Sequence, residues 1–219
     1  MRGWKDCSKR LNATEKCHQQ ESRILSGSSS QLVIIAGPNG AGQSTLAPLL
    51  LRDWLGLMEF VNADTIASGL SAFHPESAAI EAGRIMLRRL HELAAKGESF
   101  AFETTLTTRS YARWLSQLSG GGYRVSLMFI WLDSAELAIE RVRARVVSGG
   151  HDIPEETVRQ RYRKGICNFF ALYRQLAESW GVYDNSAPGS PVMLAQGERT
   201  SVQRVFLPDR WARFCEVAK

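Results

Sequence analysis

Residues 31–45 read QLVIIAGPNGAGQST and carry the strongest indication of the fold. The first six residues are largely aliphatic and rich in β-branched side chains, which is typical of a strand buried in a parallel sheet. The next nine follow the P-loop pattern GxxxxGK[ST], except that Gln43 stands where the pattern has lysine. A strand that runs into such a loop, with a helix after it, predicts a nucleotide-binding α/β domain.

The P-loop is expected to bind ATP. Glycines let backbone N–H groups turn inward around phosphates, and the start of the following helix adds positive potential. The hydroxyl of Ser44 is expected to bind Mg²⁺. The predicted nucleotide-binding residues are Gly37, Pro38, Asn39, Gly40, Ala41, Gly42, Gln43, Ser44 and Thr45.

Gln43 changes what this loop is expected to do. A lysine at its position neutralises charge on the β- and γ-phosphates during phosphoryl transfer. Glutamine can donate a hydrogen bond but carries no charge, so we expect nucleotide binding to persist while transfer slows severely. Two explanations stay open: a substitution introduced into an active kinase, or a naturally degenerate kinase. The otherwise intact motif favours the first.

Composition narrows the function classes. The 219 residues include 27 Lys and Arg against 22 Asp and Glu, and 44% are hydrophobic, which excludes a wholly disordered chain. The basic excess suits an anionic ligand, but no aromatic and basic platform for nucleic acid is visible. No apolar run is long enough to span a membrane, and the four cysteines suit neither a disulfide scaffold nor a metal site. We therefore expect a cytoplasmic protein with neither a nucleic-acid nor a membrane partner.

Strands and helices alternate along the rest of the chain. Strands are predicted at 58–62, 99–103, 125–132, 192–195 and 202–206, and helices at 75–96, 109–118, 134–147 and 154 to about 180. This alternation implies a parallel sheet covered on both faces. The predicted fold class is an α/β P-loop kinase with a central parallel sheet of about five strands and an arginine-rich helical lid.

Polar side chains follow the second and third predicted strands. Asn62 and Asp64 end the second strand, and Glu103, Thr104 and Thr105 end the third. Because the carboxyl ends of parallel strands line the ligand crevice, Asp64 is well placed to take a proton from a substrate hydroxyl. A helix N-cap is the equally open alternative for Asp64. Glu103 is expected to orient substrate or Mg²⁺ and the threonines to bind a sugar or phosphate, with turn formation as the alternative.

The stretch 141–164 holds seven basic and three acidic residues. Its arginines lie on two predicted helices with a Gly-containing loop between them: Arg141, Arg143 and Arg145, then Arg159, Arg161 and Arg163. Guanidinium groups can grip the spread negative charge of a triphosphate, so the stretch is predicted to form a lid over the nucleotide. A solvated helix face is the alternative for some of them.

Together these motifs resemble the zeta-toxin family of small P-loop kinases. The resemblance extends from about Leu32 to Asp184. It is carried by the P-loop, VNAD at 61–64, His74-Pro75, FAFETT at 100–105, and RVRARVVSGGHDIPEETVRQRY at 141–162. Zeta toxins are the toxin components of toxin–antitoxin systems. The family transfers the γ-phosphate of ATP to a hydroxyl of a UDP-activated amino sugar, which blocks the synthesis of cell-wall precursors.

The resemblance implies the same reaction for this chain, on a sugar of the UDP-N-acetylglucosamine type. It implies that Asp64 is the catalytic base, that Glu103 and Thr105 contact the substrate, and that Arg145 and Arg161 stabilise the transferred phosphoryl group. Gln43 completes the predicted catalytic set, and the predicted substrate contacts are Asn62, Glu103, Thr104, Thr105 and Arg109. The alternatives are a P-loop kinase for another small metabolite and a catalytically inactive nucleotide-binding module.

Residues 1–30 are predicted to be a polar extension, helical or disordered, that precedes a kinase domain at 31–219. The linker at 27–30 separates the two. Because a toxin needs restraint, one hypothesis is that the extension covers the nucleotide site in place of a separate antitoxin protein. An unstructured tail is the alternative.

Overall fold

The computed structural model describes residues 29–48, 51, 56–71, 75–150 and 152–218. Residues 1–28 of the predicted extension at 1–30 and the motif residue His74 therefore lie outside the described residues. One sheet with the strand order β2-β3-β1-β4-β5-β6-β7 forms the centre of the fold. Its strands are β1 (Gln31–Ala36), β2 (Glu59–Val61), β3 (Phe100–Thr104), β4 (Arg124–Trp131), β5 (Ser179–Asp184), β6 (Val192–Glu198) and β7 (Ser201–Val205).

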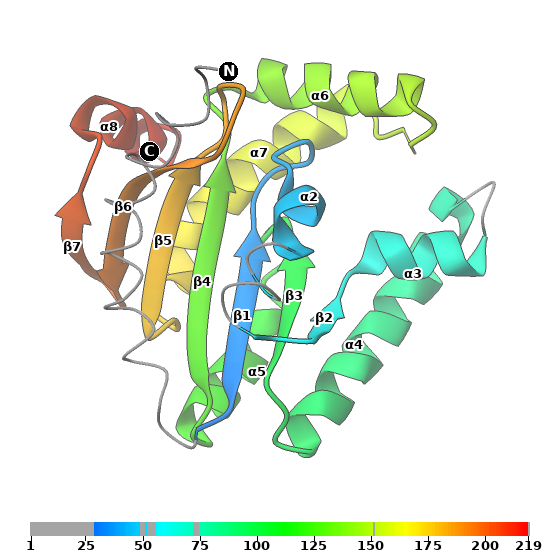
Figure 1. Ribbon diagram of the computed structural model, residues 1–219, viewed down its shortest axis with the longest axis vertical. Helices are drawn as coiled ribbons and strands as arrows, with labels where there is room; N and C mark the ends of the chain where they lie inside the picture. Colours follow the sequence, from blue (N-terminus) through cyan, green and yellow to red (C-terminus); the bar gives the residue numbers. More distant parts are fainter. Residues whose placement is uncertain (1–28, 49–50, 52–55, 72–74, 151, 219) are drawn as a thin grey trace, which may run out of the picture.

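The five strands from β2 to β5 in this order are parallel, and β6 and β7 extend the sheet in the antiparallel sense. Strand β1 lies between β3 and β4, and its residues 32–36 are at most 3% exposed, which explains its continuous aliphatic sequence. The five parallel strands end at the same edge of the sheet (Figure 1). That edge is where the loops with the candidate site residues begin.

Helices surround the sheet, and two of them bear directly on its carboxyl edge. The helices are α2 (Gln43–Pro48), α3 (Ala63–Leu70), α4 (Ala79–Ala95), α5 (Tyr111–Gly120), α6 (Ala135–Val147), α7 (Glu155–Asn168) and α8 (Pro208–Glu216). Helix α6 runs across the ends of the strand arrows and α7 passes behind β4 and β5 (Figure 1). The predicted α/β P-loop kinase fold is confirmed. Instead of a parallel sheet of about five strands, the described residues form a mixed sheet of seven, in which β6 and β7 are antiparallel.

The prediction is wrong for residues 169–180. A single helix was expected from Pro154 to about Trp180, but α7 ends at Asn168, a π-helical turn follows at Phe169–Tyr173, and β5 begins at Ser179. In β5 the side chains of Trp180 and Val182 are buried on alternate positions, as a strand requires. The pairing of β5 with β4 decides the outcome, and this contact cannot be read from local periodicity.

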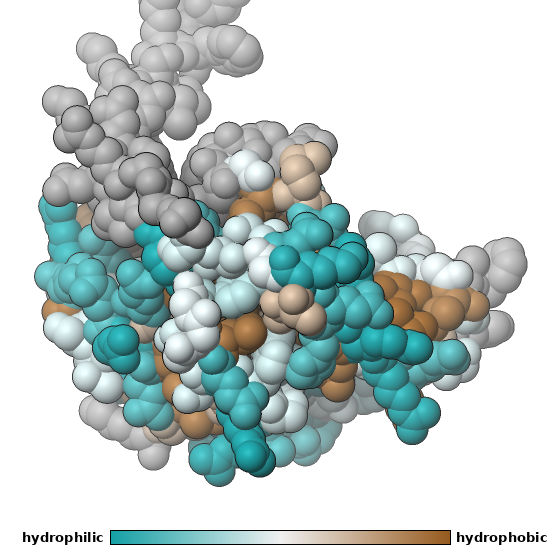
Figure 2. Space-filling view, turned by 90° about the horizontal axis from the view of Figure 1, so that it is seen from below, coloured by the Kyte–Doolittle hydropathy of each residue, from teal (hydrophilic) through white to brown (hydrophobic). Residues whose placement is uncertain are grey.

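The surface on the amino-terminal side of the strands is mostly hydrophilic (Figure 2). A hydrophobic patch lies on the side of α3 and α4 in this view. The exposed large apolar side chains of these two helices are Leu70, Ile80 and Leu87. Within the described residues, no helix is both long enough and apolar enough to cross a membrane.

Candidate functional site

The P-loop is held in a conformation that only glycine allows at two positions. Gly40 and Gly42 have φ angles of 79° and 88°, in the left-handed region that disfavours other residues. A Cβ atom at Gly40 would lie 2.8 Å from the carbonyl oxygen of Ala138 in α6, and one at Gly42 would lie 2.9 Å from Nδ2 of Asn185. The loop is therefore closely packed against α6 and against the residue that follows β5.

Gln43 is turned into the base of the loop. Its side-chain Nε2 donates a hydrogen bond of 2.8 Å to the carbonyl oxygen of Gly37 and lies 3.5 Å from the carbonyl oxygen of Thr104. The residue is only 5% exposed. The amide thus joins the start of the loop to the end of β3, and its donor is used within the protein.

Ser44, Asn62 and Glu103 form a polar cluster where the P-loop meets the ends of β2 and β3. The hydroxyl of Ser44 donates to Oε2 of Glu103 over 2.8 Å, and Nδ2 of Asn62 donates to the same carboxylate oxygen over 2.6 Å. Asn62 Nδ2 also lies 3.3 Å from the Ser44 hydroxyl. Three residues from three separate elements therefore meet around one carboxylate.

The environment of Glu103 favours its neutral form. Burial is the main cause and raises its pKa to about 7, and the negative charge of Asp64 acts in the same direction. The hydrogen bonds from Ser44 and Asn62 and the charge of Arg145 lower the pKa. A carboxylate with a pKa near neutrality is poised to ionise when a cation approaches.

The donors of this cluster fit Mg²⁺. Hydroxyl and carboxylate oxygens are the ligands that Mg²⁺ prefers, and it commonly binds one or two protein oxygens together with substrate phosphates and water. The Ser44 hydroxyl and Glu103 supply two such oxygens 2.8 Å apart. Among the described residues there is no group of three or more Asp, Glu, His and Cys that could hold a metal by itself. A cation at this place would therefore depend on phosphate oxygens for the rest of its ligands.

The N-cap of α3 is Asn62, so the capping alternative for Asp64 is wrong. The Asn62 side-chain oxygen accepts hydrogen bonds from the backbone N–H groups of Asp64 at 2.7 Å and Thr65 at 3.1 Å. Asp64 lies in the first turn of α3, and its side chain is exposed. Asn62 itself is buried, and both ends of its amide contact the protein. A role of Asn62 in substrate binding stays a prediction.

The residues after β3 form a tight turn. Leu106 is fully buried and has a positive φ of 56°, and the Asn168 side chain in α7 donates to its carbonyl oxygen over 2.7 Å. The Thr104 hydroxyl accepts from the N–H of Leu106, and the Thr105 hydroxyl contacts that of Thr107 at 3.0 Å. Both predicted substrate-binding threonines thus contribute to the turn. Arg109 lies beyond it and is exposed, close enough to Tyr173 to lower the pKa of that hydroxyl, although burial raises this pKa to about 12 overall.

Some arginines of α6 and α7 pair with glutamates of the other helix, whereas Arg161 contacts the P-loop. Arg143 pairs with Glu155, and Arg159 pairs with Glu136, so two ion pairs join the helices. Arg161 instead donates to the side-chain oxygen of Asn39 in the P-loop at 3.2 Å.

The two other arginines of α6 are Arg141 and Arg145. The side chain of Arg145 is partly exposed and acts electrostatically on Glu103. The Arg141 guanidinium donates to the carbonyl oxygen of Ser186 at 3.1 Å. The geometry therefore brings Arg145 and Arg161 toward the P-loop cluster, while their predicted catalytic role stays a prediction.

Asn185 was missed by sequence reasoning, because its strand was assigned to a helix. It follows β5, and its Nδ2 donates to the carbonyl oxygen of Ala41 in the P-loop at 2.8 Å. Its backbone N–H donates to the carbonyl oxygen of Trp131 at the end of β4. Two buried alternate positions, Trp180 and Val182, are the local sign of this strand, and they form too short a pattern to separate a strand from a helix.

Comparisons with known proteins identify the family of this chain. The AAA domain family matches residues 32–164. An uncharacterized protein of Haemophilus influenzae is 31% identical over 133 residues, which cover 61% of this chain and 93% of that protein.

Two solved structures share the fold over nearly the whole chain. A complex of AvrRxo1-ORF1 and -ORF2 with ATP superposes with a TM-score of 0.66 at 18% identity, covering 97% of this chain and 73% of that one. The PezAT chromosomal toxin–antitoxin system of Streptococcus pneumoniae gives a TM-score of 0.58 at 15% identity, covering 94% and 96%. This chain belongs to the AAA domain family, with the fold of a P-loop kinase.

Proposed function

We propose that this protein is an ATP-dependent kinase that phosphorylates a hydroxyl group of a UDP-activated amino sugar. The observation that carries the proposal is the cluster of Ser44, Asn62 and Glu103, which joins the P-loop to the first turn of α3, where Asp64 lies. The cluster brings a phosphate-binding loop, a candidate cation site and a candidate base to one edge of the sheet.

The P-loop residues 37–45 would bind the phosphates of ATP through backbone N–H groups. Ser44 and Glu103 would hold Mg²⁺, which when bound neutralises phosphate charge. Arg161 would move from Asn39 to the phosphates, because a guanidinium forms a stronger hydrogen bond with a phosphate than with a neutral amide. Arg145 would act on the same charge from α6.

A cavity of about 380 Å³ offers room for the acceptor substrate. It runs beside β2 and is lined by Asn62 and Thr65 and by the apolar side chains of Phe60 and Ile85. Asp64 lies next to this lining in the first turn of α3 and is not part of it. Arg88 in α4 also lines it. Glu59 and Glu92 line the cavity too, and both form ion pairs with Arg89. The apolar side chains and the exposed Arg88 are the features that suit a sugar linked to a diphosphate.

The exposed carboxylate of Asp64 would accept the proton of the attacking hydroxyl. In phosphoryl transfer the protein contributes mainly position and charge, so the alignment of Asp64 with the P-loop is the central requirement. A substrate with both an amino sugar and a diphosphate, together with ATP, is found in the cytoplasm, and we place the protein there.

The experiment is a phosphoryl-transfer assay with a panel of UDP-sugars and other small hydroxylated metabolites. It uses the unmodified chain, Gln43→Lys and the double variant Gln43→Lys with Asp64→Asn. The proposal expects transfer to UDP-N-acetylglucosamine by Gln43→Lys and its loss in the double variant, with ATP binding retained. Transfer to another metabolite alone would overturn the assignment of the substrate, and normal turnover by the double variant would overturn the base.

A second candidate is a nucleotide-binding module without transferase activity. The favouring observation is that the Gln43 amide is buried and bonded to Gly37 within the loop. This alternative expects ATP binding in all variants and transfer in none, including Gln43→Lys.

Restraint by a partner belongs to the proposal of a toxic kinase. The restraint would come from a separate antitoxin protein or from residues 1–26 of the same chain. Deletion of residues 1–26 in the Gln43→Lys variant should increase growth inhibition if the restraint is in cis. Unchanged growth inhibition would leave the separate antitoxin as the source.

A further inference from the structure

We propose that the C-terminal helix α8 is a positioning element of the nucleotide site, acting through Arg210 and Arg213. These residues form ion pairs with the carboxylates at the ends of β4 and β5, and hydrogen bonds extend from there to the P-loop and to α6. The inference deepens the proposed function and rests on its nucleotide-binding part. The matched family region ends at residue 164, so it contains neither arginine.

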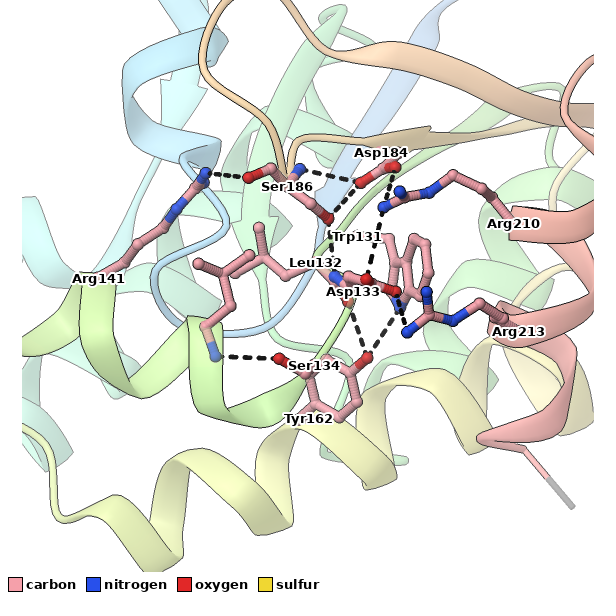
Figure 3. A network of polar contacts seen from close by, with 11 residues as sticks. Trp131, Leu132, Asp133, Ser134, Arg141, Tyr162, Asp184, Ser186, Arg210 and Arg213 are labelled. Carbon is pink, nitrogen blue, oxygen red and sulfur yellow. Dashed lines mark hydrogen bonds and ion pairs between the residues drawn. The ribbon is translucent and has the colours of Figure 1, made fainter.

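Two arginines from one face of α8 each contact a different strand end. Nη2 of Arg210 lies 2.6 Å from Oδ2 of Asp184, the last residue of β5, and 3.9 Å from Oδ2 of Asp133. Nη2 of Arg213 lies 2.8 Å from Oδ1 of Asp133, which follows β4. The side chain of Asp184 is only 9% exposed. The arginines therefore neutralise two neighbouring carboxylates (Figure 3).

An aromatic cluster fixes α8 in this position. Phe214 is fully buried, and its ring lies 5.4 Å from that of Phe129 and 5.8 Å from that of Trp131. The Arg210 guanidinium lies over the Trp131 ring at 5.6 Å. Because Phe214 is the residue after Arg213, the packing of the helix determines where the guanidinium groups lie.

Hydrogen bonds connect Asp184 to α6. The backbone N–H of Ser186 donates to Oδ1 of Asp184 at 2.9 Å, and the Ser186 hydroxyl also donates to this oxygen. The same hydroxyl accepts from the backbone N–H of Asp133 at 2.8 Å. The Ser186 carbonyl oxygen in turn accepts from Arg141. The position of Ser186 thus depends on Asp184, whose other oxygen is bound by Arg210 (Figure 3).

Asn185 connects the same segment to the P-loop. It stands between Asp184 and Ser186, and its side chain donates to the carbonyl oxygen of Ala41. A Cβ atom at Gly42 would lie only 2.9 Å from Nδ2 of Asn185, so the loop and the segment pack together at a place where only glycine fits. A change in the position of residues 184–186 would therefore shift Ala41, whose loop presents N–H groups to phosphate.

Loss of Arg210 should change the conformation of the P-loop. Its removal leaves a mostly buried carboxylate without its cationic partner, and such a charge seeks water or a new partner. The expected movement of Asp184 would release Ser186 and Asn185 together. Coupling through such contacts changes affinities by a few-fold up to about thirtyfold.

The test measures the affinity of the full chain for ATP by calorimetry, without an acceptor substrate, alongside the melting temperature. Arg210→Ala should weaken ATP binding about tenfold, and Arg210→Lys, which keeps a charge near Asp184, should restore part of the loss. The matched control is Arg204→Ala. Arg204 is an exposed arginine of β7 that also lies over an aromatic ring, at 4.6 Å from Phe206, and its loss should leave ATP binding unchanged.

Asn185→Ala tests the path. The double variant of Arg210→Ala and Asn185→Ala should bind ATP no more weakly than whichever single variant has the lower ATP affinity. Both changes break the same connection between α8 and the P-loop. If Arg210→Ala is too unstable to purify, Arg213→Ala and Asp184→Asn take its place with the same expectation.

The possible results distinguish the positioning role of α8 from the proposed nucleotide site. A lower melting temperature with unchanged ATP affinity would overturn the positioning role, and so would fully additive losses in the double variant. Failure of the unmodified chain to bind ATP would overturn the proposed nucleotide site, and this inference with it.

Discussion

The hydroxyl of Ser44 lies 2.8 Å from a carboxylate oxygen of Glu103, although the two residues are 59 positions apart in the sequence. They meet because β1 and β3 are neighbours in the sheet and Ile35 stands opposite Glu103. The P-loop that follows β1 then returns over the end of β3. This contact places the candidate cation site between the P-loop and the end of β3.

Replacement of Gln43 by lysine should raise phosphoryl transfer by orders of magnitude. The glutamine amide is uncharged and bonded to Gly37, whereas a lysine would place a positive charge beside the β- and γ-phosphates. The measurement is product formation with UDP-N-acetylglucosamine. Gln43→Met, which removes the amide without adding a charge, serves as control and should show no gain. Equal activity of the lysine variant and the unmodified chain would contradict the prediction.

Asn62 has two separable tasks, and a pair of variants distinguishes them. Serine retains the N-cap of α3 but loses the donor to Glu103, whereas alanine loses both. Asn62→Ala should therefore unfold with about 1 kcal/mol less stability than Asn62→Ser. Both should weaken the Mg²⁺ dependence of ATP binding equally, since both lack the amide beside Ser44. Denaturant unfolding and ATP titrations with and without Mg²⁺ provide the measurements, and identical stabilities would show that the cap contributes nothing.

Burial raises the pKa of Glu103 to about 7, above its usual value of 4.5, and this has a defined effect on stability. The folded protein binds this proton more tightly than the unfolded chain does. The free energy of unfolding that this tighter proton binding contributes is therefore fully present below pH 4.5 and is lost as the pH rises toward 7. Glu103→Gln resembles the protonated form, so its stability relative to the unmodified chain should increase between pH 4.5 and pH 8.

Denaturant unfolding at several pH values, with a chelator present, tests this dependence. The control is Glu140→Gln at an exposed position of α6, which should change stability by a similar amount at each pH. A gain for Glu103→Gln that is independent of pH, or that is larger at low pH, would show that Glu103 is ionised throughout the range.

Most of the parallel sheet and the P-loop could be predicted from the sequence, because their signals are local. The aliphatic run at 31–36, the glycines of the loop and the capping residue Ser134 each act within a few residues. Strand β5 and helix α8 could not be predicted in this way. Trp180 reads equally well as the end of an amphipathic helix, and only its pairing next to β4 makes it part of a strand.

The candidate site shows the same division between local and long-range information. The carboxyl ends of β2 and β3 indicated the edge of the sheet where Glu103 and the first turn of α3 with Asp64 lie, and the roles of both residues stay predictions. However, Asn and Asp are both good N-caps, so the sequence could not decide which of Asn62 and Asp64 caps α3. The contact of Asn185 with Ala41 depends on β5 and therefore could not be predicted from the local sequence.

Arg161 is expected to contribute to phosphoryl transfer from ATP, whereas its neighbour Arg163 is not. Arg161 contacts Asn39 in the P-loop, whereas Arg163 lies on the exposed side of α7. Arg161→Ala should lower the rate of transfer in the Gln43→Lys background by at least about tenfold, because an arginine on the transferred phosphoryl group stabilises its charge. Arg163→Ala removes the same charge from the same helix and should leave the rate unchanged. Equal effects of the two changes would mean that only the net charge of the lid matters.

Arg88 provides the corresponding test on the acceptor side. It lines the cavity beside β2, whereas Arg84 lies one turn earlier on α4, is exposed and does not line the cavity. If Arg88 binds the diphosphate of the sugar nucleotide, Arg88→Ala should raise the KM for that substrate several-fold and leave the KM for ATP unchanged, because a contact with a non-reacting group contributes mainly to binding. Arg84→Ala should change neither constant, since it removes an equal charge outside the cavity. An increase in both KM values for Arg88→Ala would place its effect on the fold of α4, and an unchanged KM for the sugar nucleotide would mean that the acceptor binds elsewhere.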